Sequence, residues 1–213
     1  MTDSVKRTYS SQLRAAHGRE TRRLIVSAAA RLFTDHGFTR TTVDAIAEEA
    51  GVSRKTVFSA VGGKAELLKL ALDWAIVGDD EPIALEHRPA LSATKQATDP
   101  AAIIRGWVEV VTTIAARVAG LTAALAGAAT ADDDARQLWN QSQRQRLTGA
   151  RAFIDHLAAH GGLRAGLSPD HAADIAWLHS DPAIYRRLVI ERGWTRPDFE
   201  AWLLRAITSQ LLN

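Results

Sequence analysis

Apolar residues recur at helical spacing along most of this chain, and no stretch shows the persistent alternation of a β-strand. Residues 19–36 illustrate the pattern, because Ile25, Ala29 and Leu32 fall on one side of a helix while charged residues fall largely elsewhere. Gly37 follows, as glycine often does just past the end of a helix. With 213 residues, the chain can bury a sizeable core without disulfides or metals. The sequence therefore predicts an all-α fold.

Capping residues and glycines divide the remainder of the chain into further helices. Thr41 or Thr42 can cap one helix that Gly51 would end, and Ser53 can then cap the next. Residues 78–100 contain three of the six prolines and predict the longest loop. The expected helices cover residues 19–36, 42–50, 53–61, 64–77, 101–130, 132–160, 168–180, 182–192 and 195–211.

The helices expected at 42–50 and 53–61 have the spacing of a helix-turn-helix, although a generic helical hairpin shares it. In the second helix Val57 and its apolar neighbours face one side, whereas Arg54 and Phe58 project from the other. Arginine can hydrogen-bond the edge of guanine, and phenylalanine can contact the methyl group of thymine. This separation of faces predicts that the second helix reads the major groove of DNA.

Charge divides the chain at about the same place. Residues 1–64 contain 11 lysines and arginines against 6 aspartates and glutamates, whereas the remainder contains 15 against 18. A basic block on a mildly acidic body indicates a polyanionic partner for the block alone. Lys6, Arg7 and Arg14 lie in a segment expected to be a disordered arm, which either enters the minor groove of DNA or is a simple tail.

The sequence does not contain the full set of residues for a metal, nucleotide-binding or catalytic site. The absence of cysteine excludes disulfides, thiolate zinc sites and cysteine nucleophiles. The GGK at residues 62–64 ends like a nucleotide-binding P-loop, but the earlier glycine and the following Ser or Thr are missing. His156 and His160 lack the glutamate of a zinc protease, and the aspartates at 132–134 suit the start of a helix. We expect no metal, no cofactor and no enzymatic activity.

One segment, residues 110–131, is apolar enough to be considered for a membrane span. It is rich in Ala and Thr and carries Arg117 near its middle, which favours a buried helix. The first 23 residues carry charges but no apolar run, so they do not predict a secretory signal. These features predict a cytoplasmic protein without a membrane partner.

A specific combination of residues lies between positions 21 and 68. It comprises Leu32, Phe33, Gly37, Phe38, Thr41, Thr42, Ile46, Ala47, Ala50, Gly51, Val52, Ser53, Lys64, Leu67 and Leu68. In this combination the sequence resembles the TetR family of bacterial transcriptional repressors. Residues 174–207 also resemble the end of a ligand-binding domain that is common in that family.

The resemblance implies an all-helical homodimer that binds a palindromic operator and releases it when a small molecule binds. The implied domains are a flexible basic arm at 1–18, a helix-turn-helix DNA-binding domain at 19–64, and a helical ligand-binding and dimerisation domain at 65–213. The last two long helices, at 170–180 with its extension and at 197–211, are implied to form the dimer.

The candidate DNA contacts combine the exposed face of the expected reading helix with the family's pattern. Phe58 stands where the family most often has tyrosine, so the phosphate contact of that hydroxyl is missing, and Val61 stands where phenylalanine is usual. Lys64 is expected to contact a backbone phosphate. The candidates are Thr42, Ser53, Arg54, Lys55, Thr56, Phe58, Ser59 and Lys64.

All six tryptophans lie outside the expected DNA-binding domain, which predicts an apolar, aromatic-lined effector site, although plain core or dimer packing is the favoured explanation for any single one of them. The candidate pocket residues are Trp107, Val111, Ile114, Trp139, Phe153 and Trp177.

Two other functions remain as hypotheses: a helical enzyme or small-molecule carrier without specific DNA binding, and an architectural protein that binds any DNA.

Overall fold

The computed structural model describes the backbone of residues 2–81 and 89–212, and the side chains of residues 16–81 and 92–212. All regular secondary structure in these ranges is helical, as expected. The helices are α1 (Thr2–Arg40), α2 (Val43–Glu49), α3 (Arg54–Ala60), α4 (Lys64–Val77), α5 (Pro89–Gln96), α6 (Pro100–Ala128), α7 (Asp133–Ala159), α8 (Pro169–His179), α9 (Pro182–Tyr185), the π-helical η2 (Arg186–Glu191) and α10 (Arg196–Leu211).

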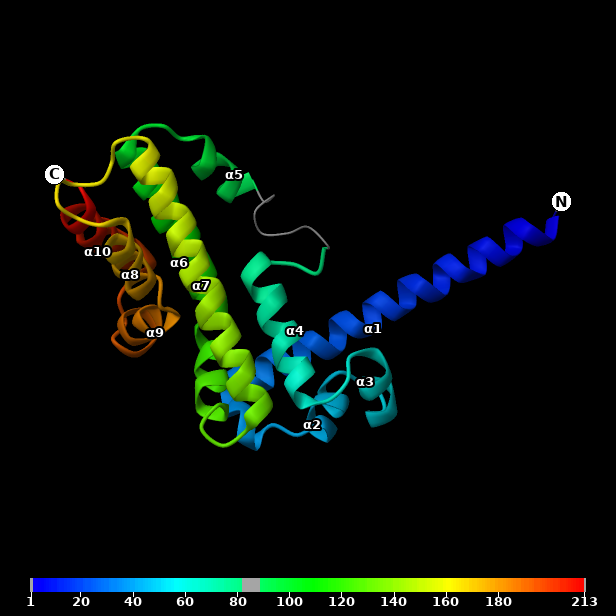
Figure 1. The fold of residues 1–213 in the computed structure, drawn as a ribbon. Coiled ribbons are helices and arrows are strands. Elements are labelled where there is room, and N and C mark those ends of the chain that lie inside the picture. Colours follow the sequence, from blue (N-terminus) through cyan, green and yellow to red (C-terminus); the bar gives the residue numbers. More distant parts are fainter. Residues whose placement is uncertain (1, 82–88, 213) are drawn as a thin grey trace.

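Two long helices, α6 and α7, run side by side through the body of the molecule (Figure 1). Helices α2 and α3 lie near one end of this pair, and α4 connects them to the body. Helices α8, α9 and α10 lie on the other side of α6 and α7 (Figure 1). The N-terminal half of α1 projects away from the rest of the chain (Figure 1). We call α1, α2 and α3 with the start of α4 the head, and the remaining helices the body.

Gly37 interrupts α1, as the sequence predicts. Its φ of 74° and ψ of 171° lie outside the helical region, so the chain bends there before α2. The hydroxyl of Thr41 lies 3.0 Å from the carbonyl oxygen of Leu32 and 2.8 Å from that of Gly37. This buried hydroxyl holds the bend against the end of the helix.

The start of α1 differs from the expected flexible arm, because the helix begins at Thr2. No proline interrupts residues 2–18, so the hydrogen-bond ladder of the helix can continue through them. The side chains of Lys6, Arg7 and Arg14 lie outside the described ones, and their contact with DNA stays a prediction.

The two short helices begin at the residues expected from capping. The Oγ1 of Thr42 accepts a hydrogen bond from the N–H of Ala45 at 3.1 Å, and the Oγ of Ser53 accepts one from the N–H of Thr56 at 3.1 Å. Gly51 turns the chain between them with a φ of 66°, a value that side chains rarely permit. The expected helix-turn-helix is confirmed.

The loop expected at 78–100 is wrong in its second half, where α5 forms. Proline is tolerated at the first position of a helix because its missing N–H would have no partner there. A short helix is marginal by itself, and α5 is stabilised by its contact with α6. The contact is close at Gly106, where an added Cβ would lie 2.6 Å from the Oγ1 of Thr94. Residues 82–88 of the expected loop lie outside the described residues.

The helix expected at 182–192 is divided into α9 and η2. Arg192 donates its N–H to the carbonyl oxygen of Arg187 at 3.1 Å, which is the wider spacing of a π-helix. Gly193 ends the segment with a φ of 73°. Ile190, on this wider turn, is 60% exposed.

Buried apolar residues form two clusters, and α6 contributes to both. The first cluster contains residues of α1, α2, α3 and α4, of α6 from Val118 onward, and Ala135 of α7. The second contains residues of α6 as far as Ala119 and residues of α7, α8, α9 and α10. Among the described helices, α6 alone has the length and composition to cross a membrane, with 39% of its most apolar window buried. Its position between the two clusters supports the buried helix expected for residues 110–131.

Candidate nucleic-acid interface

Helix α3 is anchored to the head by the apolar face expected from the sequence. Val57 is completely buried in the first cluster, and Ala60 and Val61 pack against that cluster. Burying a valine side chain contributes about 1.5 kcal/mol or more. The orientation of α3 on α1 and α2 is therefore defined by packing.

The opposite face of α3 is open to solvent. Arg54, Lys55 and Ser59 are exposed, and Phe58 is 46% exposed. An exposed phenylalanine between cations gains free energy if a partner removes its ring from water. The structure thus brings six of the eight candidate DNA contacts, those from Ser53 to Ser59, onto one helix and its cap.

Arg54 is held between two neighbours. Its Nη1 donates to the Oδ2 of Asp44 on α2 at 2.6 Å, and its Cζ lies 5.5 Å from the ring centroid of Phe58. The side chains of Arg54 and Asp44 are 59% and 65% exposed, and such exposed pairs contribute at most about 1 kcal/mol to stability. Asp44 was not among the residues predicted from the sequence. The signal was its place in the first turn of α2, ten residues before Arg54 in the first turn of α3.

Hydroxyl groups lie beside these side chains. Because the Oγ1 of Thr42 acts as an acceptor for its cap, its hydrogen remains available to donate to a phosphate oxygen. The Oγ of Ser53 and the Oγ1 of Thr56 are 2.8 Å apart, so one of them donates to the other. Ser59 donates to the carbonyl oxygen of Thr56 at 3.1 Å.

Lys64, the first residue of α4, lies over the ring of Phe38, with its Nζ 4.1 Å from the ring centroid. Burial lowers the pKa of Lys64. The turn before it requires glycine at Gly62, whose φ is 121°, and the N–H of Gly63 donates to the Oε2 of Glu66 at 3.0 Å. This turn joins the end of α3 to the start of α4, where Lys64 stands.

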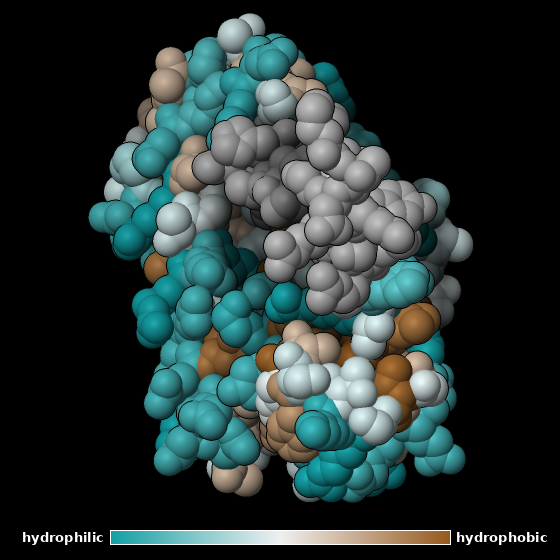
Figure 2. Space-filling model, turned by 90° about the vertical axis from the view of Figure 1, so that its right-hand side faces the viewer, coloured by the Kyte–Doolittle hydropathy of each residue, from teal (hydrophilic) through white to brown (hydrophobic). Residues whose placement is uncertain are grey.

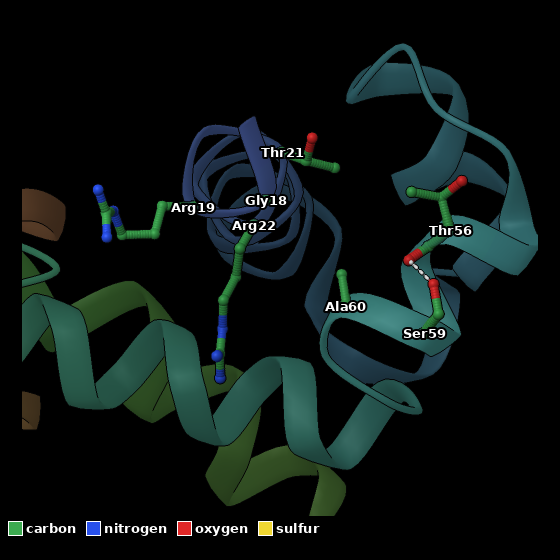
Figure 3. Close-up of a pocket in the computed structure, with 7 residues that line it drawn as sticks. All are labelled: Gly18, Arg19, Thr21, Arg22, Thr56, Ser59 and Ala60. Carbon is green, nitrogen blue, oxygen red and sulfur yellow. Dashed lines mark hydrogen bonds between the residues drawn. The ribbon is translucent and has the colours of Figure 1, made fainter. Parts of the chain in front are cut away.

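A pocket that was not predicted from the sequence opens between α1 and α3. Figure 3 shows that Arg19 extends from α1 away from α3 and that Arg22 extends toward α4. Neither arginine makes an ion pair within the described part of the chain. The run GRETRR at residues 18–23 was the signal for this charge. The pocket is lined by Gly18, Arg19, Thr21, Arg22, Thr56, Ser59 and Ala60.

The face that Figure 2 shows, seen from the side of α1 and α3 in Figure 1, is largely hydrophilic in its described part. Its hydrophobic side chains gather in separate small patches in the lower half of the view (Figure 2). Such a surface suits a polar, charged partner better than a broad apolar one.

The six candidate effector contacts are divided between the two clusters. Trp107 and Phe153 are buried and stack with ring centroids 4.6 Å apart. The pocket between α1 and α3 and a second pocket at α8, α9, η2 and α10 are lined by other residues, and an effector site at these six stays a prediction. Val111 and Trp177 pack against the second cluster, and Ile114 and Trp139 against the first.

Arg146 joins α7 to α8 inside the body. Its Nη1 donates to the carbonyl oxygen of Trp177 at 3.1 Å, its Cζ lies 4.9 Å from that ring, and its Nη2 lies 3.6 Å from the Oδ2 of Asp181. Burial lowers the pKa of Arg146. Two other buried polar atoms of the body, the Oγ1 of Thr112 and the Nε1 of Trp177, have no hydrogen-bond partner among the described residues.

The histidine pair and the aspartate run make local structural contacts. The Nε2 of His156 lies 2.9 Å from the carbonyl oxygen of Ala97, and the Nδ1 of His160 lies 2.9 Å from that of His156. Asp132 caps α7 by accepting from the N–H of Ala135 at 2.8 Å. Within the described residues, no group of three or more histidines and acids is arranged to hold a metal ion.

A helix-turn-helix head that exposes cations and an aromatic ring on its second helix, carried by a larger helical body, defines a class of DNA-binding proteins. Residues 25–71 match the family model for "Bacterial regulatory proteins, tetR family". Over these residues, which include most of the head and of α4, the chain is similar to the TetR family.

Two curated relatives and one solved structure extend the comparison. The chain is 36% identical over 77 residues to the uncharacterized HTH-type transcriptional regulator TtgW and to the HTH-type transcriptional regulator SrpR, both of Pseudomonas putida. These 77 residues are 36% of this chain, and they span about half of TtgW (54%) and a third of SrpR (34%). A putative transcriptional regulator from Saccharomonospora viridis, solved in complex with choline, has the same fold with a TM-score of 0.71. It is 19% identical, over 92% of this chain and 99% of that one.

Proposed function

We propose that this protein is a cytoplasmic transcriptional repressor that binds a palindromic operator as a homodimer and is released by a small hydrophobic or aromatic effector. The observation that carries the proposal is the exposed face of α3, with Arg54, Lys55 and Phe58, in a head of the TetR family. Binding and release require no catalytic step.

Each candidate side chain has a place in this mechanism. With α3 in the major groove, Arg54 and Lys55 would donate to base edges, and Phe58 would cover the methyl group of a thymine. The hydroxyl of Thr42 and the ammonium group of Lys64 would bind backbone phosphates, which orient the head without reading sequence. Arg19 and Arg22 would add positive charge to the head as a whole.

The homodimer is supported by apolar residues exposed on the far side of the body. Leu178 on α8 is 56% exposed and lies in a pocket together with Ile184, Leu188 and Trp202, contributed by α9, η2 and α10. His179, Asp181 and Arg187 also line this pocket, and apolar side chains gathered at the surface among polar ones are typical of an interface. Two heads related by a twofold axis would then meet half-sites about 34–36 Å apart, or multiples of that distance.

The effector proposal is supported by the aromatic residues of the body. The stacked pair Trp107 and Phe153 suits a flat or apolar molecule. The unpartnered Oγ1 of Thr112 and Nε1 of Trp177 would each gain a hydrogen bond from a polar atom of the effector. Choline in the S. viridis relative is a small organic ligand on this fold.

Selection of bound DNA from a random pool tests the DNA-binding part of the proposal. The expected result is a palindromic consensus, against which Arg54→Ala or Lys55→Ala costs about 1–3 kcal/mol of binding free energy where the residue pairs a base. Lys64→Ala should weaken specific and random DNA to the same degree and reduce the salt dependence by about one counterion. Lys69→Ala is the control, because Lys69 is paired with Asp73 at 2.6 Å outside the reading helix.

Selection without any consensus would contradict the proposal and favour the carrier or enzyme alternative. Equal affinity for all sequences would favour an architectural DNA protein. A screen of small hydrophobic compounds for a raised melting temperature tests the effector, and a hit is expected to release the selected DNA. A compound that binds without changing DNA affinity would contradict the release mechanism.

A further inference from the structure

An exposed carboxylate lies next to the candidate reading helix. Asp44 is in the first turn of α2, and 65% of its side chain is exposed. A carboxylate near DNA is repelled by the phosphates, so it lowers affinity unless it contributes something else. Its contact with Arg54 is exposed as well and adds little to folding stability.

Two neighbours of Arg54 leave one edge of its guanidinium group free. Asp44 accepts from Nη1 at 2.6 Å, and the ring of Phe58 lies 5.5 Å from Cζ. Arg54 makes no other hydrogen bond with the described side chains and backbone. The Nε and Nη2 groups together form a pair of donors that matches the O6 and N7 acceptors of guanine.

In a complex with DNA, an arginine without such neighbours can donate to acceptors other than the base edge. Its long side chain adopts many rotamers, and phosphate oxygens receive most protein–DNA hydrogen bonds. The negative charge of Asp44 disfavours a phosphate at the same place and holds the guanidinium group in one direction. Ordering the side chain before binding also reduces the entropy lost in the complex.

We propose that Asp44 is a positioning residue for base recognition by Arg54, and that through this pair the head selects guanine at one position of each half-site. The inference rests on the proposed function, because it requires that α3 enters the major groove. Asp44 itself lowers affinity for DNA in general, and in exchange raises the preference for the correct sequence.

The test compares the unaltered full-length protein with three single variants and one double variant, by selection from a random DNA pool and by titration with the selected site and with random DNA. Arg54→Ala first identifies the position that Arg54 reads. Asp44→Asn removes the charge while keeping the size of the side chain. Glu49→Gln is the matched control, because Glu49 pairs with Arg31 at 2.8 Å in the same head, both side chains are exposed, and α3 is not involved.

Asp44→Asn is expected to bind random DNA more tightly and to lose the guanine preference at the Arg54 position. Its ratio of specific to random affinity should fall about tenfold, as expected when one bidentate base contact is weakened. Glu49→Gln should keep the guanine preference. In an Arg54→Ala background Asp44→Asn should change the base preference no further, which a structural role of Asp44 would not predict.

The inference is overturned if Asp44→Asn retains both the guanine preference and the affinity ratio of the unaltered protein. It is also overturned if Asp44→Asn changes a position that Arg54→Ala leaves intact, because Asp44 would then read a cytosine amino group itself. If Glu49→Gln has the same effect, net charge alone is responsible. If the unaltered protein selects no sequence, the proposed function fails before the variants are compared.

Discussion

Two buried threonines differ in whether their hydroxyl group has a hydrogen-bond partner. Thr41 is 2% exposed, and its hydroxyl contacts the carbonyl oxygens of Leu32 and Gly37. Thr112 is completely buried, and its hydroxyl has no partner among the described residues. A buried hydroxyl contributes only when it is hydrogen-bonded, and it costs free energy when it is not.

Replacing each threonine by valine should therefore have opposite effects. Thr41→Val is expected to lower the free energy of unfolding by about 1–3 kcal/mol, because it leaves buried carbonyl groups without their donor. Thr112→Val is expected to be neutral or to raise it by up to about 1 kcal/mol. Urea unfolding of both variants checks this, and equal losses would contradict it.

At the scale of elements, α1 and α6 approach closely at Gly120. A Cβ added there would lie 3.1 Å from the Cβ of Thr34 and 2.9 Å from its Oγ1. We expect Gly120→Ala to cost about 1–3 kcal/mol of stability, as overpacking does. Adding Thr34→Ala should recover most of that loss, as measured by a double-mutant cycle in urea.

Gly149→Ala is the control for this prediction, because Gly149 is exposed within α7 and nothing lies near an added Cβ. The free energy of unfolding of this variant should rise by about 0.5–1 kcal/mol from helix propensity alone. A loss for Gly149→Ala, or no rescue of Gly120→Ala, would show that steric contact between α1 and α6 is not the cause.

An ion pair links α1 to the segment that follows α4. The Nη2 of Arg23 donates to the Oδ1 of Asp80 at 2.8 Å, and this hydrogen bond holds the pKa of Asp80 below its usual range. A lowered carboxyl pKa stabilises the fold above the ordinary pKa of aspartate, near 4. The contribution is lost as the pH falls through the lower value in the folded protein.

Asp80→Asn should therefore be less stable than the unaltered protein at pH 7, and the difference should narrow as the pH falls below about 4. Unfolding by urea at a series of pH values measures the difference. In an Arg23→Gln background the difference should be small at every pH. A difference that widens on acidification would contradict the assignment to this pair.

At the scale of the whole molecule, a substitution at Leu178 tests whether the protein forms the proposed dimer through α8. Leu178→Glu places a charge on the exposed apolar surface of α8, and burying that charge in an interface would be unfavourable. We expect a monomer in sedimentation and weaker operator binding than in the unaltered protein. Leu24→Glu, at a leucine of α1 that is 48% exposed, should leave the assembly state unchanged. A Leu178→Glu protein that remains dimeric would place the interface elsewhere.

Local signals predicted most of the head. The caps at Thr42 and Ser53 and the turns at Gly37 and Gly51 were readable because each acts on residues close in sequence. The outward face of α3 was readable for the same reason, since one helix separates Val57 from Arg54 by its own period. The Arg54–Asp44 contact was not, because it depends on how α2 packs against α3.

Local residue patterns were enough to predict the all-helical fold, the places where most helices begin and end, and the polar and apolar faces of α3. Hydrogen-bonding caps, glycine conformations and helical periodicity act within a few residues, so they need no knowledge of the fold. The formation of α5 could not be predicted in this way, because a helix this short is stabilised by its contact with α6. The contact of Asp44 with Arg54, and the division of the six aromatic and apolar candidates of the body between two clusters, could not be predicted either, since packing brings these residues together from distant parts of the chain.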